Sequence, residues 1–130
     1  MMTHQPATEN EIVVPELKQL LKQNTPAPLL VDVRESFEYE AGAIEGACHV
    51  PLSALEEDLG NQADLLKHFP EAVQVALTDQ SSAQPIILYC KKGGRSMRAL
   101  EALRAVSLPA GEDCQARSLA GGYEAWSSII

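Results

Sequence analysis

Apolar residues follow two patterns along the chain, continuous runs and helical spacing. Residues 28–34 and 85–89 form apolar runs that end in charged or reactive side chains, which is typical of strands buried on both faces. Shorter runs over 12–14, 46–51 and 116–120 predict three more strands, although 12–14 is also compatible with a hydrophobic staple for the next helix. Strands that alternate with helices predict an α/β fold, with a parallel sheet covered on both faces.

Apolar residues three and four positions apart predict the longer helices. These begin at Pro15, within 61–77, near Ser96 and at Tyr123. Pro70 interrupts the second, because proline lacks the N–H that a helix interior needs. Capping residues predict two short helices. One begins at Ser36 and ends at Gly42, and the other begins at Ser53, with Glu56 completing a capping box.

The length and composition fit one globular domain. The chain has 130 residues, of which 45% are apolar and 22% charged, enough to bury a core without disulfides or metal. Residues 1–11 are polar and unpatterned, so we expect a disordered lead or linker there and one domain over 12–130.

Charge and cysteine content exclude several classes of protein. The net charge of -8 argues against nucleic acid and anionic membranes as partners. No apolar run approaches the roughly 18 residues of a membrane helix, and the N-terminus lacks a signal-peptide pattern. Three widely spaced cysteines indicate a reducing compartment, so we expect a cytoplasmic protein. No Cys-x-x-Cys or His-x-x-x-His motif is present, and we expect neither a metal nor another cofactor.

The most informative segment follows the strand at 85–89. It reads Cys90, Lys91, Lys92, Gly93, Gly94, Arg95 and Ser96, and then becomes helical. Ligands of parallel sheets lie beyond the carboxyl ends of strands, where Cys90 stands. Gly93 and Gly94 allow positive φ, so that backbone N–H groups can point inward, while the cations and the helix N-terminus favour an anion. We therefore expect a lowered pKa for the Cys90 thiol and an anion-binding loop around it.

Such a loop suits a thiolate that attacks an anionic electrophile, either a phosphate ester or a sulfane sulfur. The alternative is a buried cysteine before an ordinary basic helix turn. No histidine stands at a spacing that indicates a Cys–His pair. His49 follows a short strand and is interpreted as structural. Cys48, Tyr123 and Trp126 are interpreted as core residues.

Four segments in this order resemble the rhodanese family of sulfurtransferases. They are residues 30–39 (Leu-Val-Asp-Val-Arg-Glu with Glu38-Tyr39), 42–52, 90–96 and 119–126. The resemblance implies a five-stranded parallel sheet and ping-pong transfer of sulfur through a persulfide on Cys90. It implies that Lys91, Lys92 and Arg95 bind the donor and that backbone N–H groups over 91–95 stabilise the persulfide. Asp32, Arg34 and Glu38 match positions near the family's site, in either a direct or a structural role.

Loop length distinguishes two reactions on this fold. The spacing here is Cys-x4-Arg, whereas phosphatases of similar fold resemble Cys-x5-Arg, with room for a phosphate. A phosphatase or arsenate-type reductase is therefore the second hypothesis. A non-catalytic module and a redox sensor with an oxidisable Cys90 are further alternatives.

The sequence departs from the usual family pattern at Gly42-Ala43-Ile44, where the family usually has Gly-His-Ile. Two long segments, 59–84 and 105–117, resemble the rhodanese domain of adenylyltransferase–sulfurtransferase fusions. Resemblance to the rhodanese family implies a small anionic sulfur donor. Resemblance to the fusions implies a ubiquitin-like sulfur carrier as the acceptor, with a cysteine desulfurase as an alternative protein partner, and leaves open whether the chain is free-standing. Cys114 is interpreted as an incidental loop cysteine, with a relay thiol as the alternative.

Overall fold

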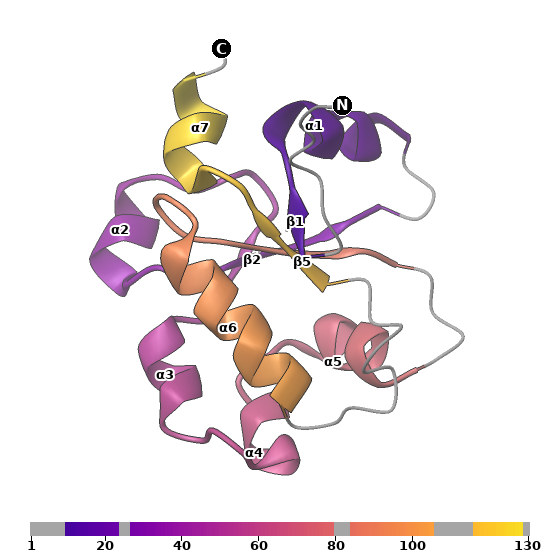
Figure 1. The fold of residues 1–130 in the computed structure, drawn as a ribbon, viewed down its shortest axis with the longest axis vertical. Coiled ribbons are helices and arrows are strands. Elements are labelled where there is room, and N and C mark those ends of the chain that lie inside the picture. Colours follow the sequence, from indigo (N-terminus) through magenta and orange to yellow (C-terminus); the bar gives the residue numbers. More distant parts are fainter. Residues whose placement is uncertain (1–9, 24–26, 80–83, 106–115, 129–130) are drawn as a thin grey trace, which may run out of the picture.

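Five parallel strands form a single sheet in the order β1-β5-β4-β2-β3 (Figure 1). The computed structural model of the protein describes residues 10–23, 27–79, 84–105 and 116–128. The strands are β1 (Glu11–Ile12), β2 (Leu29–Asp32), β3 (Cys48–His49), β4 (Ile86–Tyr89) and β5 (Ala116–Leu119). All four pairings are parallel, so every carboxyl end lies at the same edge. The predicted α/β fold and its five parallel strands are confirmed.

Helices follow the strands. They are α1 (Val14–Gln23), α2 (Ser36–Ala41), α3 (Leu52–Glu56), α4 (Gln62–Leu66), α5 (Glu71–Thr78), α6 (Gly94–Ala105) and α7 (Gly122–Ser128). The predicted interruption at Pro70 is confirmed, because Pro70 is the N-cap of α5 and separates it from α4. None of the helices in the described part of the chain combines the length and the apolar composition needed to span a bilayer.

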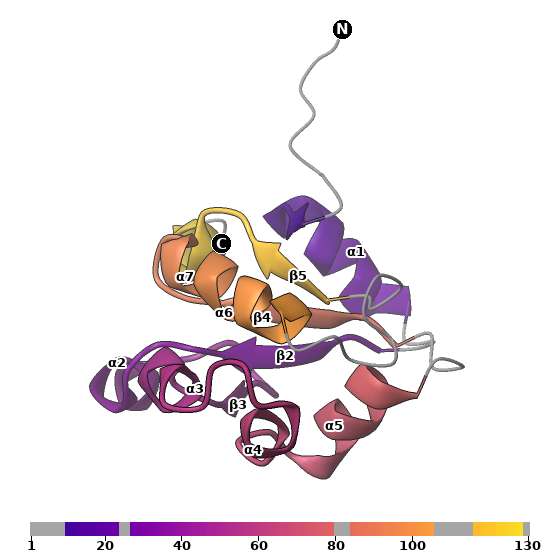
Figure 2. The same cartoon turned by 60° about the horizontal axis from the view of Figure 1, so that its bottom comes forward.

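The helices cover both faces of the sheet. Along β4, Ile86 and Leu88 pack into one cluster with residues of α3 to α6, whereas Ile87 and Tyr89 pack into a second cluster with α1 and α7. This alternation follows from the period of two in a strand. Figure 2 shows α3, α4 and α5 on the opposite side of the sheet from α1. The sheet is therefore buried on both faces, which its continuous apolar strands predicted.

Two predicted helix caps are wrong. Glu35, not Ser36, is the N-cap of α2, and its backbone N–H donates to Glu38 Oε1 at 3.0 Å. A carboxylate at the third helical position accepts from the cap residue in this way, so Glu35 and Glu38 form a capping box. The helix α3 begins directly after Pro51, so Ser53 lies inside its first turn and does not cap it. Proline presets the extended backbone that a cap position requires.

The three residues that were predicted to belong to the core pack against it. Tyr123 and Trp126 pack against the cluster that contains α1, and Cys48 is half-buried against the other cluster. The strand β1 begins at Glu11, one residue inside the segment that we assigned to a lead. Cys114 lies outside the described residues.

Candidate active site

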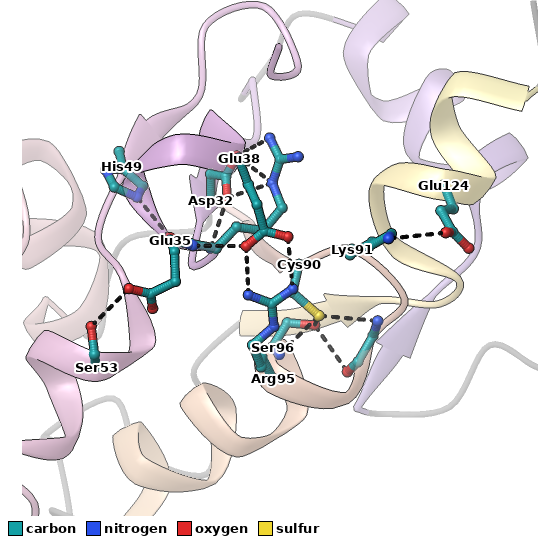
Figure 3. A network of polar contacts seen from close by, with 12 residues as sticks. Asp32, Glu35, Glu38, His49, Ser53, Cys90, Lys91, Arg95, Ser96 and Glu124 are labelled. Carbon is teal, nitrogen blue, oxygen red and sulfur yellow. Dashed lines mark hydrogen bonds and ion pairs between the residues drawn. The ribbon is translucent and has the colours of Figure 1, made fainter. Parts of the chain in front are cut away.

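Cys90 stands immediately after β4, at the carboxyl edge of the sheet. Its side chain is 1% exposed, and it reaches the floor of an open pocket of about 400 Å³. The pocket is lined by Cys90, Lys91, Lys92, Gly94, Arg95 and Arg98. Gly93 has a φ of +118°, as predicted, but Gly94 starts α6 and is not among the glycines with positive φ, so that part of the prediction is wrong. A buried sulfur beneath exposed cations is the main feature of this edge (Figure 3).

Uncharged donors surround the Cys90 sulfur. The Gly93 N–H donates to Sγ at 3.0 Å and the Ser96 N–H at 3.4 Å, while the Ser96 hydroxyl lies 3.6 Å away. Burial opposes ionisation, but hydrogen bonds from the Ser96 hydroxyl and from the N–H groups of Ser96, Gly93 and Lys92 outweigh it, so the pKa of Cys90 lies below its ordinary value. These donors therefore favour the thiolate form of Cys90 relative to an ordinary cysteine.

The Ser96 hydroxyl is itself fixed by its neighbours. It lies 2.6 Å from Ser118 Oγ on β5 and 3.1 Å from the Gly93 carbonyl oxygen. Both serines are fully buried. Because the Gly93 carbonyl oxygen can only accept, the single Ser96 proton points either at that oxygen or at the Cys90 sulfur, and Ser118 donates to Ser96 in both arrangements. The sequence analysis did not identify Ser118, whose only signal is a polar residue within an apolar strand.

Carboxylates reach the cations of the pocket from other helices. Glu38 of α2 accepts two hydrogen bonds from Arg95, at 2.7 and 3.0 Å, in a bidentate pair (Figure 3). These hydrogen bonds, working against burial, lower the pKa of Glu38 to about 2. Lys91 lies 3.9 Å from Glu124 of α7. The sequence analysis predicted Arg95 as a donor-binding residue but did not predict its pairing with Glu38.

Asp32 and Arg34 form a separate support beside the pocket. Arg34 donates to Asp32 Oδ2 at 2.7 Å and to the Gly42 carbonyl oxygen at 2.6 Å, and its guanidinium carbon lies 4.4 Å from the centroid of the Tyr123 ring. Both members of the ion pair are buried, and neither lines the Cys90 pocket. These contacts favour the structural role over the direct one for both residues.

His49 belongs to the same support. Its Nε2 lies 2.7 Å from the Arg34 carbonyl oxygen, and its ring stacks on Tyr39 at 4.6 Å. The structural interpretation of His49 is confirmed. Among the described residues, no three His, Cys, Asp or Glu side chains gather as a metal site would need.

Comparison with known families agrees with this geometry. Residues 13–129 match the Rhodanese-like domain family. The chain is a rhodanese-like domain. A solved structure with the same fold is the human single-domain sulfurtransferase TSTD1, with a TM-score of 0.62 and 28% identity over 95% of this chain and 99% of that one.

Curated relatives of this rhodanese domain fall into two kinds. The adenylyltransferase and sulfurtransferase MOCS3 of Danio rerio is 31% identical over 127 residues, which is 98% of this chain and 27% of that protein. The human thiosulfate:glutathione sulfurtransferase is 30% identical over 115 residues, which is 88% of this chain and 90% of that protein. The predicted resemblance to the fusion proteins is confirmed, and the chain spans about a quarter of their length.

The rhodanese loop depends on one more segment, the turn at Gly121 and Gly122. The N–H groups of Tyr123 and Glu124 donate to the carbonyl oxygens of Cys90 and Lys91 at 2.7 and 3.0 Å. A Cβ on Gly122 would lie 2.5 Å from the Cys90 carbonyl oxygen, and the φ of Gly122 is +60°. Only glycine permits this approach. The two consecutive glycines belong to the segment 119–126 that carried the family resemblance, but the sequence analysis did not predict their contact with the Cys90 loop.

Proposed function

We propose that this domain is a sulfurtransferase that carries sulfane sulfur as a persulfide on Cys90. The observation that carries the proposal is the pair of backbone N–H groups, from Gly93 and Ser96, that donate to Sγ at the floor of an open pocket. These donors stabilise a negative charge on sulfur without neutralising it, so the thiolate stays nucleophilic. The family membership supports sulfur as the transferred atom.

The reaction has two halves. The Cys90 thiolate attacks the outer sulfur of a donor such as thiosulfate, the S–S bond of the donor breaks, and sulfite leaves with its electron pair. The persulfide terminus carries the negative charge next to the same N–H groups. In the second half, a nucleophilic acceptor attacks the outer sulfur and releases the Cys90 thiolate. Lys91 and Lys92 are exposed at the mouth of the pocket and attract the anionic donor, while Arg95 lines it beside them.

The open pocket supports a thiol as the acceptor, on a small molecule or on a protein. The names of two relatives, a thiosulfate:glutathione sulfurtransferase and an adenylyltransferase and sulfurtransferase, make both kinds of acceptor reasonable. We propose a small thiol or a sulfur-carrier protein as the acceptor, with a cysteine desulfurase as an alternative donor. Transfer through a free thiolate needs a reducing compartment, so we place the activity in the cytoplasm.

The intact mass of the reduced protein after incubation with thiosulfate tests this proposal. We expect a gain of one sulfur atom in the parent protein and none in Cys90→Ser. Equal gains in both proteins would assign the nucleophile to Cys48 or Cys114 instead. If neither the parent nor the variant gains sulfur from thiosulfate or from a protein persulfide, the proposal is wrong.

The phosphatase hypothesis uses the same thiolate and deserves a parallel assay. A possible tyrosine phosphatase from Rhodopseudomonas palustris has the same fold, with a TM-score of 0.66, but at 18% identity it shows the fold alone. The spacing from Cys90 to Arg95 is one residue shorter than the phosphatase pattern. We expect no Cys90-dependent hydrolysis of an aryl phosphate.

A further inference from the structure

The cations that line the Cys90 pocket are largely paired with carboxylates. Three elements supply these carboxylates: Glu38 of α2 binds Arg95, Glu56 of α3 binds Arg98, and Glu124 of α7 lies 3.9 Å from Lys91. Within the part of the chain that the structure describes, Lys92 is the lining cation that forms no ion pair. The pocket therefore holds less net positive charge than its four cations suggest.

Glu38 is the most tightly held of the three carboxylates. Its side chain is 15% exposed and that of Arg95 is 31% exposed, and the two groups meet in a bidentate pair at 2.7 and 3.0 Å. Glu56 and Glu124 are 39% and 52% exposed, so water screens them more. The Glu35 N–H also donates to Glu38 Oε1, one of the two oxygens that Arg95 contacts. The negative charge of Glu38 is therefore held against Arg95, which lines the pocket.

We propose that Glu38 makes this site select singly charged sulfur donors over doubly charged ones. The inference rests on the proposed sulfur transfer and specifies its donor. At a given distance, a fixed negative charge repels a dianion about twice as strongly as a monoanion. The same carboxylate directs the Arg95 guanidinium toward α2, so less of its charge is available to donor oxygens. Glu38 acts on the donor through charge and through the position of Arg95, not through contact.

Two donors differ in charge but share the reaction. Thiosulfate is a dianion, and an alkyl thiosulfonate (an RSO2S group) is a monoanion. In both cases the Cys90 thiolate forms a new S–S bond with the outer sulfur, the old S–S bond breaks, and the leaving group departs with the electron pair. That group is sulfite for thiosulfate and a sulfinate for the thiosulfonate, so the total charge is conserved in both reactions. Steric differences between the donors cancel when the ratio of their rates is compared between protein variants.

The test is the ratio of kcat/KM for methanethiosulfonate to kcat/KM for thiosulfate, with cyanide as the acceptor. Glu38→Gln keeps a side chain that can accept from the Glu35 N–H but removes the charge. We expect the ratio to fall roughly five- to tenfold in this variant. Glu56→Gln, at an exposed pair, should lower it roughly twofold.

Glu16→Gln is the matched control. Glu16 pairs with Arg117 at 3.2 Å on β5 and does not line the pocket, so this variant changes the net charge of the protein by the same amount. We expect its ratio to equal that of the parent. A thermal melt of each variant shows whether it folds, and Glu56→Gln carries the test if Glu38→Gln does not fold.

The outcomes separate the two proposals. If the parent forms a persulfide with neither donor, the proposed sulfur transfer itself fails. If the parent is active but the folded Glu38 and Glu56 variants keep the parent's ratio, sulfur transfer stands and the selection by charge is overturned. An equal change in Glu16→Gln would also overturn it, because the effect would then be one of net charge.

Discussion

Two neighbouring strand ends use charge in opposite ways. At the end of β2, Asp32 and Arg34 neutralise each other as a buried ion pair. At the end of β4, Cys90 is buried as well, but uncharged N–H donors surround its sulfur. The two ends are adjacent, since Asp32 pairs in register with Tyr89, the residue before Cys90.

Under the proposed function, this difference separates a reactive end at Cys90 from a supporting end at Asp32 and Arg34. Arg34 donates to both oxygens of Asp32, from its backbone N–H and Nε to Oδ1 and from Nε and Nη2 to Oδ2, so that carboxylate has little acceptor capacity left for a substrate. Dipoles stabilise the Cys90 charge and leave one side of the sulfur facing the pocket. A buried charge at this edge therefore has a structural role where a countercharge pairs with it, as at Asp32. It suits chemistry where only N–H dipoles stabilise it, as at Cys90.

The largest expected effect is a loss of unfolding free energy when the Asp32–Arg34 pair at the supporting end is broken. Arg34→Ala leaves Asp32 buried without its countercharge, which should lower the free energy of unfolding by about 3–5 kcal/mol. Cys90→Ser should change it by less than about 1 kcal/mol, because the two side chains are similar in size. Urea denaturation followed by circular dichroism measures both. Similar losses of unfolding free energy in the two variants would contradict the division into a supporting end and a reactive end.

The next effect is on the reactive end. Ser96→Ala removes the hydroxyl that lies 3.6 Å from Sγ, so the pKa of Cys90 should rise toward its ordinary value. A hydrogen bond to a charged group contributes about 1.5 kcal/mol, so alkylation by iodoacetamide at pH 7 should slow roughly tenfold. Ser53→Ala changes an exposed serine on α3 and serves as the control. An unchanged rate in Ser96→Ala would mean that the backbone donors alone hold the thiolate.

A smaller effect is the pH dependence of stability that comes from the pair between Glu38 and Arg95. The hydrogen bonds from Arg95 lower the pKa of Glu38 from 4.5 to about 2. A folded-state pKa below the unfolded value stabilises the protein above pH 4.5, and this contribution is lost as the pH falls toward 2. Glu38→Gln should therefore be less stable than the parent by about 1–2 kcal/mol at pH 7, and the gap should close between pH 4.5 and 2. Equal gaps in urea denaturation at pH 2.5 and pH 7 would contradict this.

The smallest effect concerns an exposed cation of the pocket. Lys91 and Glu124 are both more than half exposed, and their charged atoms are 3.9 Å apart. Lys91→Ala should change the free energy of unfolding by less than about 0.5 kcal/mol, while KM for thiosulfate rises roughly threefold. Differential scanning calorimetry and steady-state kinetics measure the two quantities. A loss of stability without a change in KM would mean that Lys91 stabilises the fold and does not bind the donor.

Local pattern was enough to predict the strands and the place of the thiol. The apolar runs that became β2 and β4 are buried on both faces, and a residue directly after such a strand must lie at the carboxyl edge. The loop glycines and cations were also visible as neighbours of Cys90 in the sequence. These features depend on residues close together in the chain.

Contacts between distant segments were not predictable in the same way. Glu38 is 57 residues from Arg95, and Ser118 is 22 residues from Ser96, so no spacing rule connects either pair. The wrong caps at Ser36 and Ser53 have a related cause. A serine before a helix favours the cap position by propensity, but Glu35 and Pro51 occupied it once the neighbouring strands had fixed the path of the chain.

Some contacts of the Cys90 site depend on the segment 116–124, which is synthesised after Cys90. This segment supplies the Ser118 hydroxyl that fixes Ser96 and the Tyr123 N–H that binds the Cys90 carbonyl oxygen. It also supplies β5, which lies between β1 and β4 in the sheet. Because chains leave the ribosome from the N-terminus, Cys90 emerges before any of these contacts exist. Ser96 and the Cys90 carbonyl oxygen therefore gain these partners only after β5 has entered the sheet between β1 and β4.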